Sequence, residues 1–287
     1  MSKTSSGWWS GFLGVVIFSG SLPATRIAVE GFDPAFLTLA RASIAGVLAL
    51  AILWIFRQKP PAKSDLASLS IVSLGVVIGF PLLTALALRE ITSAHSIVFI
   101  GLLPLATAIF AVLRGGERPR PAFWFFSCLG SILVAGFALL QDMAGSMVGD
   151  GLMVCAVIVC GLGYAEGAAL SRRLGGWQVI SWALVLSLPV MLPLAMFLAP
   201  HSFADITGAA WGGLFYVSLF SMLIGFIFWY RGLSLGGIAA VGQLQLLQPF
   251  FGLTLAATLL GEPVSVAMVG VTLGVVACVA GARKFSK

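Results

Sequence analysis

Charge is scarce in this sequence. Among 287 residues there are only 16 Lys and Arg and 10 Asp and Glu, so charged residues make up 9% of the chain and hydrophobic residues 60%. A soluble domain uses about a quarter of its residues for charge, and a chain this apolar would expose more apolar surface in water than one core could bury. The composition therefore excludes an ordinary soluble enzyme and an intrinsically disordered protein.

Features typical of several other protein classes are also missing. There is no asparagine, hence no N-glycosylation site, and the four cysteines form no C-x-x-C pair. Basic residues form no stripe and there is no Walker A motif, which argues against a nucleic-acid partner and an ATP-driven pump. His95 and Ser96 are adjacent on one predicted helix and cannot face each other as base and nucleophile. We therefore expect no enzymatic activity, no cofactor and no metal site.

Apolar runs of about 20 residues dominate the chain instead, and short breaks rich in Gly and Pro separate them. A bilayer core about 30 Å thick needs roughly 20 helical residues to cross it. The sequence predicts an all-α polytopic membrane protein with ten transmembrane helices, near 8–29, 34–56, 66–88, 94–113, 121–140, 150–170, 177–199, 210–230, 238–260 and 264–282. These spans leave no room for a domain outside the membrane, and the lipid bilayer is an expected partner.

The basic residues predict the orientation of these spans. With a cytoplasmic N-terminus, thirteen of the 16 fall on the cytoplasmic side, namely Lys3, Arg57, Lys59, Lys63, Arg114, Arg118, Arg120, Arg172, Arg173, Arg231, Arg283, Lys284 and Lys287. The outer loops hold only Arg89. Cytoplasmic loops of membrane proteins carry an excess of Lys and Arg. We therefore predict a multi-pass protein of the inner (plasma) membrane with both termini cytoplasmic.

The two halves of the chain resemble each other weakly. VSLGVVIGF at 72–80 is similar to VSLFSMLIGF at 217–226, and other landmarks recur in the same order across all five spans. We therefore divide the chain into two five-span repeats, 1–145 and 146–287. Because five is an odd number, the second repeat must be inserted upside down. Inverted repeats around a central cavity are typical of secondary transporters, although a duplicated packing unit in a channel or membrane enzyme is an alternative.

In each half, the fourth span contains a proline that is followed at equal spacing by a Gly-Glu pair. These residues are Pro104, Gly116 and Glu117 in the first half, and Pro249, Gly261 and Glu262 in the second. Together with Arg41 in the second span, this arrangement resembles the EamA family of the drug/metabolite transporter superfamily. The resemblance covers the whole chain, although Trp182 stands where the second half would need a counterpart of Arg41.

The resemblance implies a helical bundle whose central cavity is lined by helices 1, 3, 4, 6, 8 and 9, with helices 5 and 10 at the periphery. Known members of the family export amino acids, metabolites or drugs, and exporters of aromatic amino acids are one candidate type. Relatives in the superfamily carry sugar nucleotides and sugar phosphates. Membership of the family does not fix the substrate.

Three ionisable residues stand out inside the predicted spans, where a charge needs a partner or a function: Arg26, Arg41 and Glu166. We interpret Arg26 and Arg41 either as structural, bonded to carbonyls or reaching the outer interface, or as gating residues. Glu166 either pairs with Arg172 or Arg173, or acts as a gate or proton-coupling carboxylate. Because only Arg26 lies on a cavity-lining helix, substrates with phosphate groups are disfavoured.

Pro104 and Pro249 lie in the symmetry-related fourth and ninth spans. A proline inside a helix frees the carbonyl four residues earlier, here those of Ile100 and Gln245. Such carbonyls could bind substrate and the bends could act as hinges, or the kinks could be static. Gln245 and Gln248 are three residues apart and share a helix face, so they are candidates for binding substrate or for holding helices together.

Aromatic residues are numerous, with 21 Phe, 8 Trp and 3 Tyr. Most belong to the core or the lipid interface. Phe80, Phe99, Tyr164 and Trp229 fall on helices that line the cavity in the resembling family, and Thr84 lies one turn after Phe80. An aromatic pocket with a few amides suits a ligand that is partly flat and apolar and partly zwitterionic.

Together these features predict a secondary transporter that exports amino acids, aromatic ones included, or similar small amphipathic metabolites by alternating access. The alternatives are export of other metabolites or drugs, such as nucleosides or sugars, and a channel or lipid scramblase. The expected partners are a small-molecule substrate and the bilayer. Proton antiport and facilitated uniport both stay open, as do a monomer and a homodimer.

Overall fold

The computed structural model describes residues 3–91, 96, 99–141, 146–248, 250–252, 254–255 and 266–286, and all regular structure among them is helical. The first half contains α1 (Lys3–Ser19), α2 (Ser21–Val29), α3 (Pro34–Ile55), η1 (Lys63–Asp65), α4 (Leu66–Val72), η2 (Ser73–Gly79), α5 (Phe80–Glu90), α7 (Leu103–Leu113) and α8 (Pro121–Gln141). The second half contains α9 (Met147–Leu174), α10 (Gly176–Phe197), α11 (Gly208–Tyr216), η3 (Val217–Ile224), α12 (Gly225–Gly236), α13 (Ile238–Gly242), η4 (Gln243–Leu247) and α15 (Val266–Lys284).

Six helical units are long and apolar enough to cross a membrane: Lys3–Val29, Pro34–Ile55, Lys63–Glu90, Met147–Leu174, Gly176–Phe197 and Gly208–Gly236. Each coincides with one of the predicted spans. The helices α8 and α15 coincide with two more, 121–140 and 264–282, and the predicted spans 94–113 and 238–260 are described only in part. The described part of the chain is thus all-helical, and several of its helices have the length and composition of membrane-spanning helices.

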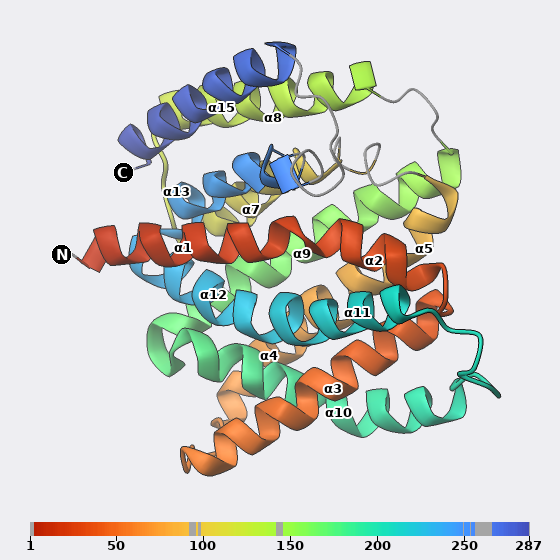
Figure 1. Ribbon diagram of the computed structural model, residues 1–287. Helices are drawn as coiled ribbons and strands as arrows, with labels where there is room; N and C mark the ends of the chain where they lie inside the picture. The colour runs from red at the N-terminus through yellow and green to blue at the C-terminus, as the bar shows by residue number, and fades with distance from the viewer. Residues whose placement is uncertain are drawn as a thin grey trace.

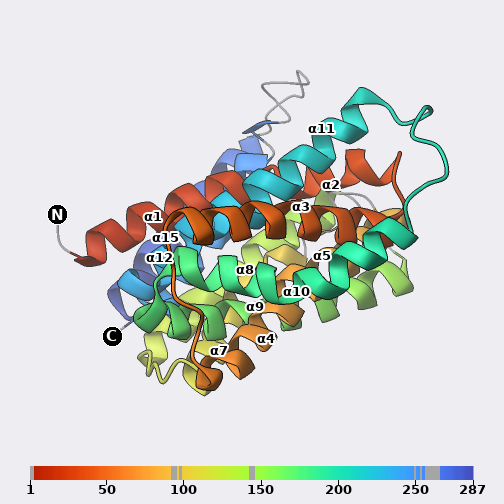
Figure 2. The ribbon, with the colours of Figure 1, turned by 90° about the horizontal axis from the view of Figure 1, so that it is seen from below.

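The helices lie roughly side by side, and both chain termini lie at the same end of the molecule (Figures 1 and 2). At one edge α8 packs against α15, at the opposite edge α3 packs against α10, and α1, α9 and α12 lie between these pairs (Figure 1). α1 packs on α12, and α9 packs on α5. The first helix of each half therefore contacts the third helical unit of the other half.

Glycines allow α1 and α12 to pack very closely. A Cβ atom on Gly7 would lie 2.5 Å from the backbone nitrogen of Gly236, and one on Gly232 would lie 2.5 Å from the backbone nitrogen of Gly11. Membrane helices associate through dispersion contacts and hydrogen bonds because lipid weakens the hydrophobic effect, so small residues at the contact favour association. This contact fixes the position of α12 relative to α1.

The first span is interrupted at Gly20, between α1 and α2. A Cβ atom at this glycine would lie 2.5 Å from the hydroxyl oxygen of Tyr216. That hydroxyl donates a 2.6 Å hydrogen bond to the carbonyl of Ile17, in the last turn of α1. The missing side chain of Gly20 thus makes room for a side chain from α11 that contacts the interruption.

The third and eighth spans each contain a π-helical segment, η2 and η3. These segments fall in the two stretches, 72–80 and 217–226, whose similarity suggested the repeat. At the end of each segment a backbone N–H bonds the carbonyl five residues earlier, from Phe80 to Gly75 and from Gly225 to Phe220. π-Helical turns are rare and are frequent at functional sites.

The fourth and ninth spans are interrupted in a different way from the prediction. Pro104 is the second residue of α7, after a turn at Gly101 and Leu102, so it begins a helix where its missing N–H is not needed. The predicted break of the fourth span near Pro104 is therefore present, but as the start of a new helix and not as a bend within a continuous one. In its described part, the predicted helix 238–260 begins with the five-residue α13, continues as the 3-10 segment η4, and is α-helical again at 248, 250–252 and 254–255. Pro249 lies outside the described residues.

Candidate functional site

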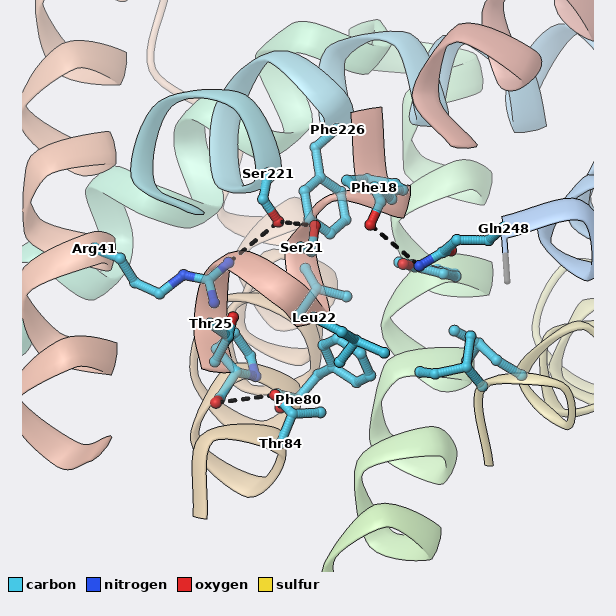
Figure 3. Close-up of a pocket in the computed structure, with 15 residues that line it drawn as sticks. Phe18, Ser21, Leu22, Thr25, Arg41, Phe80, Thr84, Ser221, Phe226 and Gln248 are labelled. Atoms are coloured by element: carbon cyan, nitrogen blue, oxygen red, sulfur yellow. Dashed lines mark hydrogen bonds between the residues drawn. The ribbon is translucent and has the colours of Figure 1, made fainter. Parts of the chain in front are cut away.

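Side chains from both halves of the chain line one cavity (Figure 3). They come from α1, α2, α3, η2, α5, the region around the start of α7, α9, η3 and α12, together with Gln248 after η4. The empty space amounts to about 520 Å³ when its opening is included, and little of it is wide enough for a water molecule. Spans one, three, four, six, eight and nine all contribute, as the resemblance implied, and α3 contributes Arg41 in addition.

Several of these side chains are positioned by the helix interruptions. Ser21 follows the break at Gly20, Phe80 follows η2, Ser221 lies within η3, and Gln248 follows η4. A change from α-helical to π or 3-10 geometry changes the number of residues per turn, so later side chains leave the face on which a regular helix would place them. The irregular segments therefore shape the cavity wall.

Arg41 is the one charged residue among the described residues that line the cavity. It is 6% exposed, and its Nη2 donates a 3.2 Å hydrogen bond to Oγ of Ser221, which also accepts a 2.8 Å bond from Oγ of Ser21. In the described part of the chain, Nε has no hydrogen-bond partner, and no carboxylate forms an ion pair with Arg41. A buried guanidinium with free donors is suited to an anionic ligand.

Aromatic rings form much of the remaining wall. The ring centroids of Phe18 and Phe226 are 5.1 Å apart, and those of Tyr164 and Phe226 are 5.8 Å apart. Arg41 and Gln248 lie at opposite sides of the cavity in Figure 3. Gln248 donates a 3.2 Å hydrogen bond from Nε2 to the Phe18 carbonyl. The cavity therefore combines a cationic side, an aromatic middle and an amide at the far side.

The structure places some of the predicted substrate-binding residues at the cavity and others behind its wall. The predicted residues that line it are Phe80, Thr84, Tyr164, Gln248 and, from the gating candidates, Arg41. Phe99 is half-buried and, like Phe80, packs against an apolar cluster next to the cavity. Trp229 is fully buried with its ring centroid 5.4 Å from that of Tyr164, and Gln245 is also fully buried.

Arg41 lines the cavity and Arg26 does not, which is the reverse of the prediction. Arg26 was the one basic candidate on a cavity-lining helix, but it does not line the cavity. Its Nη1 instead donates a hydrogen bond to the carbonyl of Leu88 on α5, which is the structural role that we considered for it. Arg41 reaches the cavity from a helix that the resemblance does not assign to the lining.

The sequence analysis missed most of the other lining residues. They include the polar and aromatic residues Phe18, Ser21, Thr25, Ser221 and Phe226. Hydroxyl groups are common in membrane helices, where most of them bond the carbonyl one turn earlier, so their sequence positions carry little information. The position of Ser21 directly after Gly20 is the one usable signal, because a glycine in a span can mark a break.

Glu166 lies away from the cavity, in a contact between α9 and the ends of two other helical units. Its Oε2 lies 2.8 Å from Nε of Arg114, and its Oε1 accepts a 2.6 Å hydrogen bond from Ser68. This hydrogen bond to the carboxylate raises the pKa of Arg114 above its usual value. The predicted pairing with Arg172 or Arg173 is wrong, since residues six or seven positions along a helix are about 10 Å away.

Glu117, from the first Gly-Glu pair, joins three parts of the chain. Its two oxygens accept hydrogen bonds from the backbone N–H groups of Ile238 at 2.7 Å and Ala239 at 2.8 Å, at the start of α13. Arg172, near the end of α9, donates to the same carboxylate at 2.8 Å. The loop after α7, in the first half, is thereby held against α9 and α13 of the second half at the end that carries the chain termini (Figure 1).

These contacts predict the behaviour of a Glu166→Gln variant. Glutamine keeps an acceptor for Ser68 but loses the ion pair with Arg114, so we expect a slightly lower melting temperature and an unchanged pH profile of transport. Arg114→Gln removes the other partner and should lower the melting temperature similarly. A flattened pH profile in Glu166→Gln alone would show that this carboxylate carries a coupled proton.

A protein-family match covers both halves of the chain. The model of the EamA-like transporter family matches residues 5–140 and, a second time, residues 147–283. The chain belongs to the EamA-like transporter family. It is accordingly a membrane transporter and not an enzyme.

Individual relatives and a solved structure agree with this membership. The chain is 69% identical to the transporter YdeK of Bacillus subtilis (strain 168) over the full length of both proteins. It is 25% identical to a protein of Streptantibioticus cattleyicolor named "Probable terminal-alkyne amino-acid exporter", across 95% of this chain and 92% of that protein. A crystal structure covering 98% of both chains matches with a TM-score of 0.79 at 17% identity, which shows a shared fold.

Proposed function

We propose that this EamA-like transporter exports amino acids, aromatic ones included, or similar small carboxylate-bearing metabolites across the inner membrane. The observation that carries the proposal is the buried Arg41 guanidinium, which has a free Nε donor and no ion-pair partner in the described chain, at the wall of a cavity shared by both halves. Arginine binds carboxylates through two parallel N–H donors, and a low-polarity site strengthens that bond.

The groups around Arg41 suit the rest of an amino acid. The hydroxyls of Ser21, Thr25 and Ser221 line the same side of the cavity and can accept hydrogen bonds from an ammonium group. The aromatic rings beyond them can contact an apolar or flat side chain. With a single cation in the described lining, the site suits one carboxylate better than a phosphate or diphosphate, which would want a cluster of basic groups.

The name of one relative supports the same substrate class. The Streptantibioticus cattleyicolor protein, 25% identical to this chain, is named as an amino-acid exporter. At this identity the name does not determine the substrate of this chain. It makes amino acids the first class of compound to test.

We further propose that transport occurs by alternating access between two inverted five-helix repeats, 1–145 and 146–287, that together make ten spans. Two observations support the two repeats. The family model matches each half separately, and the first helix of each half packs on the third helical unit of the other half, α1 on α12 and α9 on α5. The contacts of Glu117 and Glu166 hold one end of the bundle together, which suits a conformation closed on that side. We assign this side to the cytoplasm, together with both termini, because the basic residues gather there.

Competition in liposomes tests the proposed substrate class. Purified protein is reconstituted, and uptake of a radiolabelled amino acid is measured against unlabelled amino acids, their methyl esters, nucleosides and sugars. We expect amino acids to compete and methyl esters to compete at least about tenfold less well, because the ester lacks the charge that Arg41 binds. Equal competition by esters, or transport of nucleosides or sugars alone, contradicts the proposal.

A further inference from the structure

Two buried polar side chains behind the cavity wall have no hydrogen-bond partner among the described residues. In that part of the chain, nothing pairs with either amide atom of Gln245 or with the indole Nε1 of Trp229, and both residues are 0% exposed. An unpaired buried polar group is costly, and a protein that spans a bilayer has no surrounding water to pair with it. Native structures satisfy most such groups, so each exception needs an explanation.

The position of Gln245 relates it to the cavity. It lies in the 3-10 segment η4, where residues three positions apart are stacked on one face at a separation of about 6 Å along the axis. Gln248, three residues later, lines the cavity. Gln245 therefore lies on the same face of the ninth span, one turn from the cavity wall.

Tyr164 connects both unpaired groups with the cavity. Its side chain lines the cavity, and its ring centroid lies 5.4 Å from that of Trp229. Its hydroxyl lies close enough to the Gln245 side chain to interact with it, although outside the geometry of a hydrogen bond. Tyr164 is therefore the lining residue that separates the cavity from Trp229 and Gln245. Two groups that can form hydrogen bonds, the Gln245 amide and the Trp229 indole N–H, thus lie behind the aromatic part of the cavity wall.

We infer that Gln245 and Trp229 form a second compartment of the substrate site, closed by Tyr164 in this conformation, which binds a polar group at the tip of the substrate's side chain. The Trp229 N–H supplies a donor and the Gln245 amide supplies two donors and an acceptor. The ligand class is an amino acid whose side chain ends in a hydroxyl, amide or carbonyl group. This inference rests on the proposed function, because it assumes that Arg41 holds the carboxylate at the other side of the cavity.

Selectivity between tyrosine and phenylalanine tests the inference, because the two amino acids differ only in the terminal hydroxyl. A site with buried hydrogen-bonding groups discriminates strongly against an analogue that leaves them unpaired. We expect wild-type protein in liposomes to prefer tyrosine by about tenfold or more in the ratio of transport efficiencies. Gln245→Leu should reduce this ratio to within about twofold of one, mainly by weakening tyrosine transport.

Gln243→Leu is the matched control. Gln243 is likewise fully buried and unpaired, but it lies two residues before Gln245 and hence on another face of η4. Its removal should leave the preference for tyrosine unchanged. Trp229→Phe removes the indole N–H, keeps an aromatic ring, and should lower the preference even if Gln245→Leu does not fold.

The outcomes separate this inference from the proposed function. If the wild-type protein transports no amino acid, the proposed function fails. If it transports amino acids with equal efficiency for tyrosine and phenylalanine, or if a folded Gln245→Leu or Trp229→Phe keeps the wild-type preference, the second compartment is wrong while the proposed function stands. Loss of the preference in Gln243→Leu to the same degree would likewise contradict it.

Discussion

Replacing Arg41 with glutamine is expected to lower the efficiency of amino-acid transport by about 10- to 150-fold. This range corresponds to the loss of one charge-assisted hydrogen-bonded contact, about 1.5–3 kcal/mol. The loss should appear mainly as a higher KM, because in the proposed site the guanidinium holds the carboxylate of the substrate throughout its passage. Transport measured in liposomes at several substrate concentrations separates KM from the maximal rate.

Arg26→Gln is the control for this prediction. It removes a second arginine from the same half of the membrane, but one that bonds the Leu88 carbonyl instead of lining the cavity. We expect a lower melting temperature in detergent and an unchanged KM. If Arg26→Gln raises KM as much as Arg41→Gln does, or if Arg41→Gln leaves KM unchanged, Arg41 does not bind the substrate.

Replacing Gly232 with valine is expected to disrupt the fold. A Cβ atom at this position would lie 2.5 Å from the nitrogen and 2.6 Å from the Cα atom of Gly11. Backbone atoms cannot rotate away as a side chain can, so α1 and α12 would have to separate. We expect destabilisation of at least about 3 kcal/mol, more than most overpacked core substitutions cause. Loss of the monodisperse peak in size-exclusion chromatography in detergent would report it.

Gly212→Ala is the matched control for Gly232→Val. Gly212 lies within α11, and a Cβ atom there would meet nothing within 4 Å. Since alanine is also a better helix former than glycine, the variant should be as stable as the parent protein or slightly more stable. Equal stability of Gly232→Val and Gly212→Ala would contradict the close packing of α1 on α12.

The sequence alone predicted the helices well because the length of an apolar run directly reflects the thickness of a bilayer. Six helical units and the helices α8 and α15 lie where the hydropathy placed them. The weak similarity of 72–80 to 217–226 also carried structural information, since both stretches contain a π-helical segment. Both the hydropathy and the internal similarity are patterns spread over many residues, so one unusual residue does not change the prediction.

The sequence did not predict which buried side chains face one another. Arg41 faces the cavity and Arg26 does not, and Glu166 pairs with Arg114, 52 positions away in the chain, instead of with a residue on its own helix. These outcomes depend on the rotation of each helix about its axis, which the packing of neighbouring helices sets. In α2, η3 and the residues after η4, the rotation also depends on an interruption whose form the sequence does not specify.

Counterflow is the measurement that tests the central claim most directly. Liposomes containing the protein are loaded with an unlabelled amino acid at high concentration and diluted into a trace of the same amino acid carrying a radiolabel. A carrier with alternating access predicts that the label accumulates transiently above its equilibrium level, and that Arg41→Gln reduces this overshoot at least tenfold. Entry of the label without an overshoot, at a rate independent of the internal amino acid, would mean that the protein is a pore.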